Sequence, residues 1–153
     1  MTKTFDIVFD NYICDSEFEK MPSYKGVYLF RLTERKDNKL YPRVIYIGVA
    51  EGGDGLAGRV NNYHNKLNEA RKLVKIEQSK GKDVFLTISY TNKNDEYNLY
   101  WNRIKAGLIF GRKPQLNDEY TKNFGYQKTT IIINGARHQD LKKKYTIEST
   151  SNN

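Results

Sequence analysis

The sequence predicts a mixed α/β (α+β) domain whose elements follow the order β-β-α-β-α. Three segments rich in β-branched and aromatic residues predict strands, at residues 26–32, 43–49 and 84–90. Two segments with apolar residues at three- and four-residue steps predict helices, at residues 56–80 and from about 94 to 110. With 153 residues, the chain has the length of one domain with a core of its own.

The first two strands are expected to pair antiparallel, because the segment between them, Thr33–Pro42, is rich in charged and turn-forming residues. Gly81 precedes the third strand. A fourth short run, Thr129–Ile133, ends at Asn134-Gly135, which is typical of a turn.

The second helix is expected to begin at a cap formed by Asn94 or Asp95 and to end before Gly111 and Pro114. Its spacing predicts four buried residues: Leu99, Ile104, Leu108 and Ile109.

The two ends of the chain differ from its middle. Residues 1–22 carry a net charge of −3 and are predicted to form an irregular segment that packs on or covers the domain. Residues 23–120 form the predicted core, residues 121–147 a C-terminal strand with a basic extension, and residues 148–153 a frayed tail.

The chain is basic, with 26 Lys and Arg against 18 Asp and Glu, a net charge of +8. The residues after position 22 carry +11, which favours a polyanion such as nucleic acid as partner, although such a charge also serves solubility alone. No apolar run reaches the roughly 18 residues of a membrane-spanning helix, and the first residues lack the apolar core of a signal peptide. Together with a single cysteine, Cys14, these features predict a cytoplasmic protein without a membrane partner.

Four sequence elements occur in a fixed order. Gly26-Val27-Tyr28 opens the first strand, Tyr46-Ile47-Gly48 ends the second, and Arg59 lies early in the following helix. Leu108-Ile109 is then followed by Pro114-Gln115-Leu116-Asn117. In this order the chain resembles the GIY-YIG nuclease superfamily over roughly residues 26–117.

The resemblance implies a central three-stranded antiparallel sheet flanked by helices. It also implies endonucleolytic cleavage of phosphodiester bonds in DNA with one divalent cation, usually Mg²⁺. Tyr28, Tyr46 and Arg59 would then surround the scissile phosphate, a glutamate on the later helix would bind the metal, and Asn117 would support the site.

These residue types suit such a reaction. A guanidinium such as that of Arg59 binds phosphate bidentately and stays charged. A tyrosine accepts a proton from water only if cations or a metal lower its pKa. Each residue also has a purely structural interpretation: strand packing for Tyr28 and Tyr46, a solvated helix residue for Arg59, and a turn residue for Asn117.

The metal ligand is missing. The spacing of Leu108-Ile109 and the proline segment places Lys105 where the resemblance expects the glutamate, and an ammonium group cannot coordinate Mg²⁺. Glu51 and Asp54 are the nearest acidic residues that could substitute. Three explanations stay open: a nuclease-like protein that only grips nucleic acid, an inactivating substitution, or an ammonium group that replaces the metal as the positive charge.

Further residues are candidates for the site. His64 follows Arg59 in a region where some members of the resembled family use a histidine. Contacts to the substrate are expected from five cations: Arg59, Lys105, Arg137, Lys142 and Lys143.

The sequence therefore predicts a GIY-YIG-type domain that acts on DNA, with cleavage impaired or lost because of Lys105. The alternative is a non-catalytic module that holds nucleic acid or an acidic protein partner in a basic cleft. A third interpretation makes residues 1–22 an acidic lid over that cleft.

Overall fold

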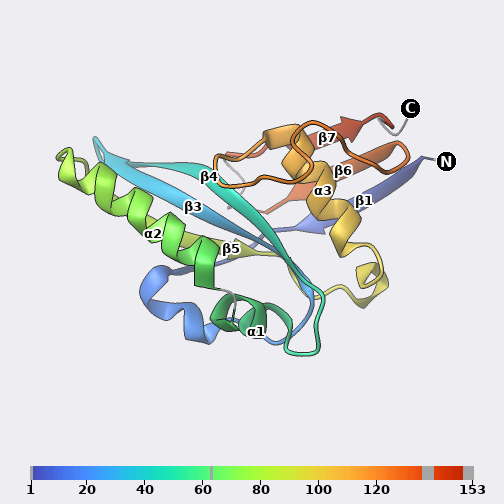
Figure 1. Cartoon of the computed structure of the whole chain (residues 1–153), viewed down its shortest axis with the longest axis horizontal. Coiled ribbons are helices and arrows are strands. Elements are labelled where there is room, and N and C mark those ends of the chain that lie inside the picture. The colour runs from blue at the N-terminus through green and yellow to red at the C-terminus, as the bar shows by residue number, and fades with distance from the viewer. Residues whose placement is uncertain (1, 63, 136–139, 150–153) are drawn as a thin grey trace.

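The computed structural model describes residues 2–62, 64–135 and 140–149 and contains two β-sheets (Figure 1). An antiparallel sheet has the strand order β2 (Asn11–Cys14), β5 (Val84–Tyr90), β3 (Gly26–Lys36), β4 (Lys39–Ala50). A smaller sheet has the order β1 (Lys3–Val8), β6 (Thr129–Asn134), β7 (Lys144–Ile147), with β1 parallel and β7 antiparallel to β6. The mixed α+β class is thus confirmed, but the sheet that contains the two motif strands has four strands instead of three.

Three α-helices accompany the sheets within the described residues: α1 (Gly55–Asn62), α2 (His64–Ser79) and α3 (Trp101–Arg112). The helix expected at residues 56–80 corresponds to α1 and α2, which the structure describes on either side of residue 63. In the part of the chain that the structure describes, no helix is long and apolar enough to cross a membrane.

A hydrophobic core lies on each face of the four-stranded sheet. Side chains alternate along β3, so that Tyr28 and Phe30 pack toward α1 and α2, while Val27 and Leu29 pack toward α3 and the smaller sheet. Tyr46 of β4 packs on the same face as Tyr28. This alternation places both motif tyrosines under α1.

The β3–β4 connection is a two-residue turn and not the expected loop over Thr33–Pro42. Asp37 and Asn38 both have positive φ, 54° and 64°, which is the backbone of a type I′ turn. Asp and Asn tolerate this conformation better than other non-glycine residues. The two strands consequently extend through the charged segment as far as Lys36 and Lys39.

The N-terminal segment is not irregular, so that prediction is wrong. In β1 the buried residues Phe5 and Ile7 alternate with exposed ones, and the strand pairs with β6 along its whole length. The next strand, β2, pairs with β5. The segment then forms a 3₁₀ helix at Asp15–Lys20, so the first 22 residues join both sheets.

The start of α3 also differs from expectation. Asn94 does act as a cap, since its side chain accepts a hydrogen bond from the Glu96 N–H at 3.1 Å, but it caps a 3₁₀ helix at Asp95–Tyr97. Leu99 lies between that turn and α3 and is 91% exposed, so its predicted burial is wrong. The other three predicted core residues are buried: Ile104, Leu108 and Ile109.

Candidate functional site

Tyr28 and Tyr46 lie together beneath α1. Their ring centroids are 6.2 Å apart. Arg59 of α1 lies near enough for its charge to act on both hydroxyls. The Tyr28 side chain is buried, whereas Tyr46 and Arg59 are half-buried. The structure thus brings together three of the residues that the sequence predicts for the phosphate site.

The motif glycines make room for this arrangement. Gly48 is paired with Tyr28 across β3 and β4, and a Cβ on Gly48 would lie less than 3.0 Å from Cζ, Oη and Cε2 of Tyr28. A Cβ on Gly26 would overlap the hydroxyl of Thr91, which accepts a hydrogen bond from the Val27 N–H at 3.1 Å. Both positions therefore require glycine for a local packing reason.

Burial governs the protonation of the tyrosine pair. It raises the pKa of Tyr28 and of Tyr46, and the charge of Arg59 opposes this rise in both. Because both pKa values lie above the usual value, both hydroxyls are protonated at neutral pH and serve as hydrogen-bond donors.

A cavity of about 440 Å³ opens beside Arg59, at the end of β4. Arg59 reaches it from α1, on one face of the sheet, and Lys105 and Asn102 reach it from α3, on the other face. Glu51 and Asp54, in the loop after β4, complete its charged lining. Residues from both faces meet here because β4 is an edge strand.

Lys105 is held in a largely dry position, with a side chain only 14% exposed. Burial lowers the pKa of Lys105; Glu119 raises it, Arg59 lowers it further, and Glu51 raises it. The Lys105 Nζ lies 3.9 Å from Oε1 of Glu119 and 5.5 Å from the centroid of the Tyr120 ring.

The charges of this cavity do not fit a divalent cation as the chain stands. Glu51 and Asp54 offer the carboxylate oxygens that such an ion prefers. The ammonium of Lys105 and the guanidinium of Arg59 line the same space, however, and would repel the ion. Among the described residues, no three His, Cys, Asp or Glu side chains are grouped as a metal site.

Asn117 contacts β4 and is not among the residues that line the cavity. Its Oδ1 accepts from the Ile47 N–H and its Nδ2 donates to the Ile47 carbonyl, both at 2.9 Å. The neighbouring Leu116 N–H donates to the Ile45 carbonyl at 2.9 Å, and Lys66 Nζ donates to the Leu116 carbonyl at 2.8 Å. The segment after Pro114 therefore covers the edge of β4 and positions the strand that carries Tyr46.

The other predicted site residues are not brought to this cavity. His64 begins α2, and its side chain is outside what the structure describes, as is Arg137. Lys142 and Lys143 are exposed ahead of β7 and do not line the cavity. None of the described residues among the first 22 lines the cavity of Arg59, so the structure does not show these residues as an acidic lid over it.

Two contributors were missed by sequence reasoning. Asn102 precedes Lys105 by three residues, and this helical spacing was the available signal that both lie on one face of α3. Lys66 carried no such signal, because its role depends on the distant carbonyl of Leu116.

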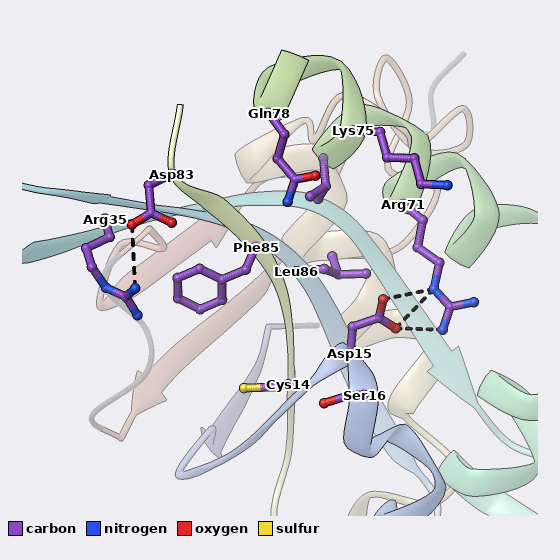
Figure 2. A pocket seen from close by; sticks show the side chains of 11 residues that line it. Cys14, Asp15, Ser16, Arg35, Arg71, Lys75, Gln78, Asp83, Phe85 and Leu86 are labelled. Atoms are coloured by element: carbon purple, nitrogen blue, oxygen red, sulfur yellow. Dashed lines mark hydrogen bonds and ion pairs between the residues drawn. The ribbon is translucent and has the colours of Figure 1, made fainter. Parts of the chain in front are cut away.

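A larger cavity, about 670 Å³, lies elsewhere, between α2 and β5 (Figure 2). At one end Arg71 donates two hydrogen bonds from Nε and one from Nη2 to the carboxylate of Asp15, and at the other Arg35 pairs with Asp83 at 3.5 Å. Phe85 lies between these two pairs in the view. None of the sequence-predicted site residues is among those that line this cavity, and its two carboxylates are paired with Arg71 and Arg35.

Comparison of the chain with protein-family models, with curated proteins and with solved structures found no match in any of the three.

Proposed function

We propose that this chain is a GIY-YIG-type domain that binds DNA by a backbone phosphate at the cavity of Arg59 and Lys105, and that it cleaves DNA poorly. The observation that supports this most is the meeting of two cations, from helices on opposite faces of the sheet, at one cavity near the packed rings of Tyr28 and Tyr46.

Phosphate chemistry explains why these groups belong together. A guanidinium offers a fork of donors that matches two phosphate oxygens, and the Lys105 ammonium supplies a second charge from the opposite wall. The hydroxyls of Tyr28 and Tyr46 are close enough to Arg59 for its charge to lower the pKa of both, although neither tyrosine lines the cavity. A divalent anion or a diester would thus meet preorganised donors and not mobile surface side chains.

The proposal of weak cleavage rests on Lys105. The resembled family uses one divalent cation held by a glutamate at this position, and here the position carries a positive charge that disfavours the ion. We derive no catalytic step through Mg²⁺ for the chain as it stands. A cytoplasmic location stays a prediction from the sequence.

The test replaces the positive charge of Lys105 with a carboxylate. With Lys105→Glu the cavity would carry three carboxylates, the new one and those of Glu51 and Asp54. We expect this variant to nick supercoiled plasmid DNA in the presence of Mg²⁺ faster than the original protein. Lys72→Glu makes the same charge change on the exposed face of α2 and serves as the matched control, for which we expect no gain.

Folding must be checked beside activity. If Lys105→Glu keeps its circular dichroism spectrum and melting transition but neither binds Mg²⁺ nor cuts DNA, the assignment of position 105 as the missing ligand is wrong.

A non-catalytic module that uses the same cavity is the second candidate, and the cationic lining favours it. DNA binding through phosphates weakens linearly on a plot of log affinity against log salt concentration. Arg59→Ala should weaken binding to DNA, while Lys72→Ala should not. If Arg59→Ala leaves DNA affinity unchanged, an acidic protein that docks elsewhere becomes the better explanation.

A further inference from the structure

A basic ribbon projects at the far end of β4 from the cavity. β5 pairs with β3 as far as Glu34, and the Arg35 N–H still donates to the Asp83 carbonyl at 2.8 Å, so only the end of the hairpin, with Lys36 paired to Lys39, lies beyond β5. Figure 1 shows this hairpin tip beside the end of α2, at the opposite end of β4 from α1. We call residues 35–41 the ribbon tip.

The ribbon tip exposes apolar as well as charged side chains. Leu40 and Tyr41 are 52% and 50% exposed, and as neighbours on a strand they point to opposite faces of the ribbon. Lys36 and Lys39 are exposed and make no ion pair within the described part of the chain. Cations with adjacent apolar side chains on a narrow two-stranded ribbon match a groove of duplex DNA, which admits such a ribbon and offers phosphates on both rims.

One further cation, Arg43 of β4, lies between the ribbon tip and the cavity of Arg59. A third cavity, about 460 Å³, is lined by Arg43, Lys82 and Arg112 and by three acidic residues, Glu34, Glu77 and Asp140. Acidic residues neutralise two of these cations, through ion pairs of Lys82 with Glu77 and of Arg112 with Asp140. Arg43 is exposed and, among the described residues, forms no ion pair.

The spacing along β4 fits the repeat of the double helix. From Leu40 to Val49, which lines the cavity of Arg59, the strand spans about 30 Å at roughly 3.3 Å per residue. One turn of B-form DNA is about 34 Å long. A ligand that contacts both ends must therefore be a straight polyanion of about nine base pairs or more.

We propose that duplex DNA lies parallel to β4, outside the segment after Pro114 that covers this strand, with one phosphate at the cavity of Arg59 and Lys105 and with the ribbon tip in a groove about one helical turn away. This inference rests on the proposed function, because it takes the cavity as the first of the two DNA contacts.

The test compares two fluorescein-labelled duplexes of about 8 and about 20 base pairs, of which only the longer one spans both contacts. Affinities are measured by anisotropy between about 50 and about 200 mM salt. The variant Lys36→Gln/Lys39→Gln is expected to reduce the log–log salt slope on the long duplex by about 1.8, or 0.9 for each lost phosphate contact. The short duplex, bound at the cavity, should show no change.

Matched controls separate the ribbon tip from charge and hydrophobicity in general. Lys72→Gln/Lys75→Gln removes two exposed charges from α2 and should leave both slopes unchanged. Leu40→Ser/Tyr41→Ser should weaken binding to the long duplex about tenfold without altering its slope, because apolar contacts release no counterions. Leu99→Ser, at an exposed leucine away from β4, should have no effect.

The outcomes distinguish the two proposals. If the unaltered protein binds neither duplex in a salt-dependent way, the proposed function fails and this inference fails with it. If it binds both duplexes but the ribbon variants match the unaltered protein on the long one, or weaken both equally, the DNA does not follow β4 and only this inference is overturned.

Discussion

Replacing Gly48 with alanine should push the Tyr28 ring out of its place and lower the free energy of unfolding by about 1–3 kcal/mol, the usual cost of overpacking a core. The added Cβ would lie under 3.0 Å from three atoms of the Tyr28 side chain. The ring is only 3% exposed and packs against Phe30 at 5.3 Å between centroids, so it has no open space to enter.

Urea unfolding followed by tyrosine and tryptophan fluorescence measures this cost. Gly52→Ala and Gly53→Ala are the controls, because a Cβ at either position meets nothing within 4 Å. We expect these controls to stay within about 0.5 kcal/mol of the original protein.

A double-mutant cycle tests the cause. In the background of Tyr28→Leu the three contacting atoms are absent, so Gly48→Ala should cost clearly less than it does beside Tyr28. Additive costs would refute the reasoning, since they would mean that the penalty arises from the strand backbone and not from the tyrosine ring.

Three further predictions concern stability. Burial raises the pKa of Tyr24 to about 12 and also raises that of Tyr28, so above pH 10 the folded state keeps protons that the unfolded state loses. The free energy of unfolding should therefore be constant below pH 10 and fall as the pH rises above it, and it should fall less in Tyr24→Phe. Urea midpoints between about pH 8 and about pH 11 measure this dependence. Asn117→Ala leaves both backbone groups of Ile47 without their side-chain partner and should lower the free energy of unfolding by about 1–2 kcal/mol, whereas an unchanged value would show that the strand edge does not depend on this amide. Lys105→Met removes a charge whose burial is unfavourable, so it should raise the free energy of unfolding by about 1 kcal/mol. A lower free energy of unfolding would mean that the ammonium group stabilises the fold through an interaction stronger than its ion pair with Glu119.

Local patterns predicted the central strands well. The runs around Tyr28 and Tyr46 are rich in β-branched and other apolar residues, and this signal depends only on residues close in sequence. The burial of Ile104 and Leu108 followed equally from helical spacing. Leu99 broke the pattern because the chain makes a 3₁₀ turn before α3, which changes the angular phase of every residue ahead of Trp101.

The second sheet was less accessible to sequence reasoning. Phe5 and Ile7 do alternate with polar residues, so β1 had a readable signal, but its partner strand begins at Thr129 and no local pattern indicates such a pairing. For the candidate site, the sequence predicted a phosphate site of Tyr28, Tyr46, Arg59 and Asn117, with Lys105 at the position of the missing metal ligand. The sequence did not indicate that the side-chain amide of Asn117 would hydrogen-bond the backbone of Ile47, because this contact depends on how two distant segments meet.

The pairing of β1 with β6 has a consequence for the order in which the chain acquires its structure. Lys3 is opposite Thr129, so β1 is synthesised long before the strand with which it pairs. The β3–β4 hairpin is closed by a two-residue turn, so its two strands are synthesised one directly after the other and are free to pair during synthesis. The nascent chain therefore carries an unpaired strand with two apolar residues, Phe5 and Ile7, until β6 has been synthesised, and this is the segment from which a chaperone requirement would arise.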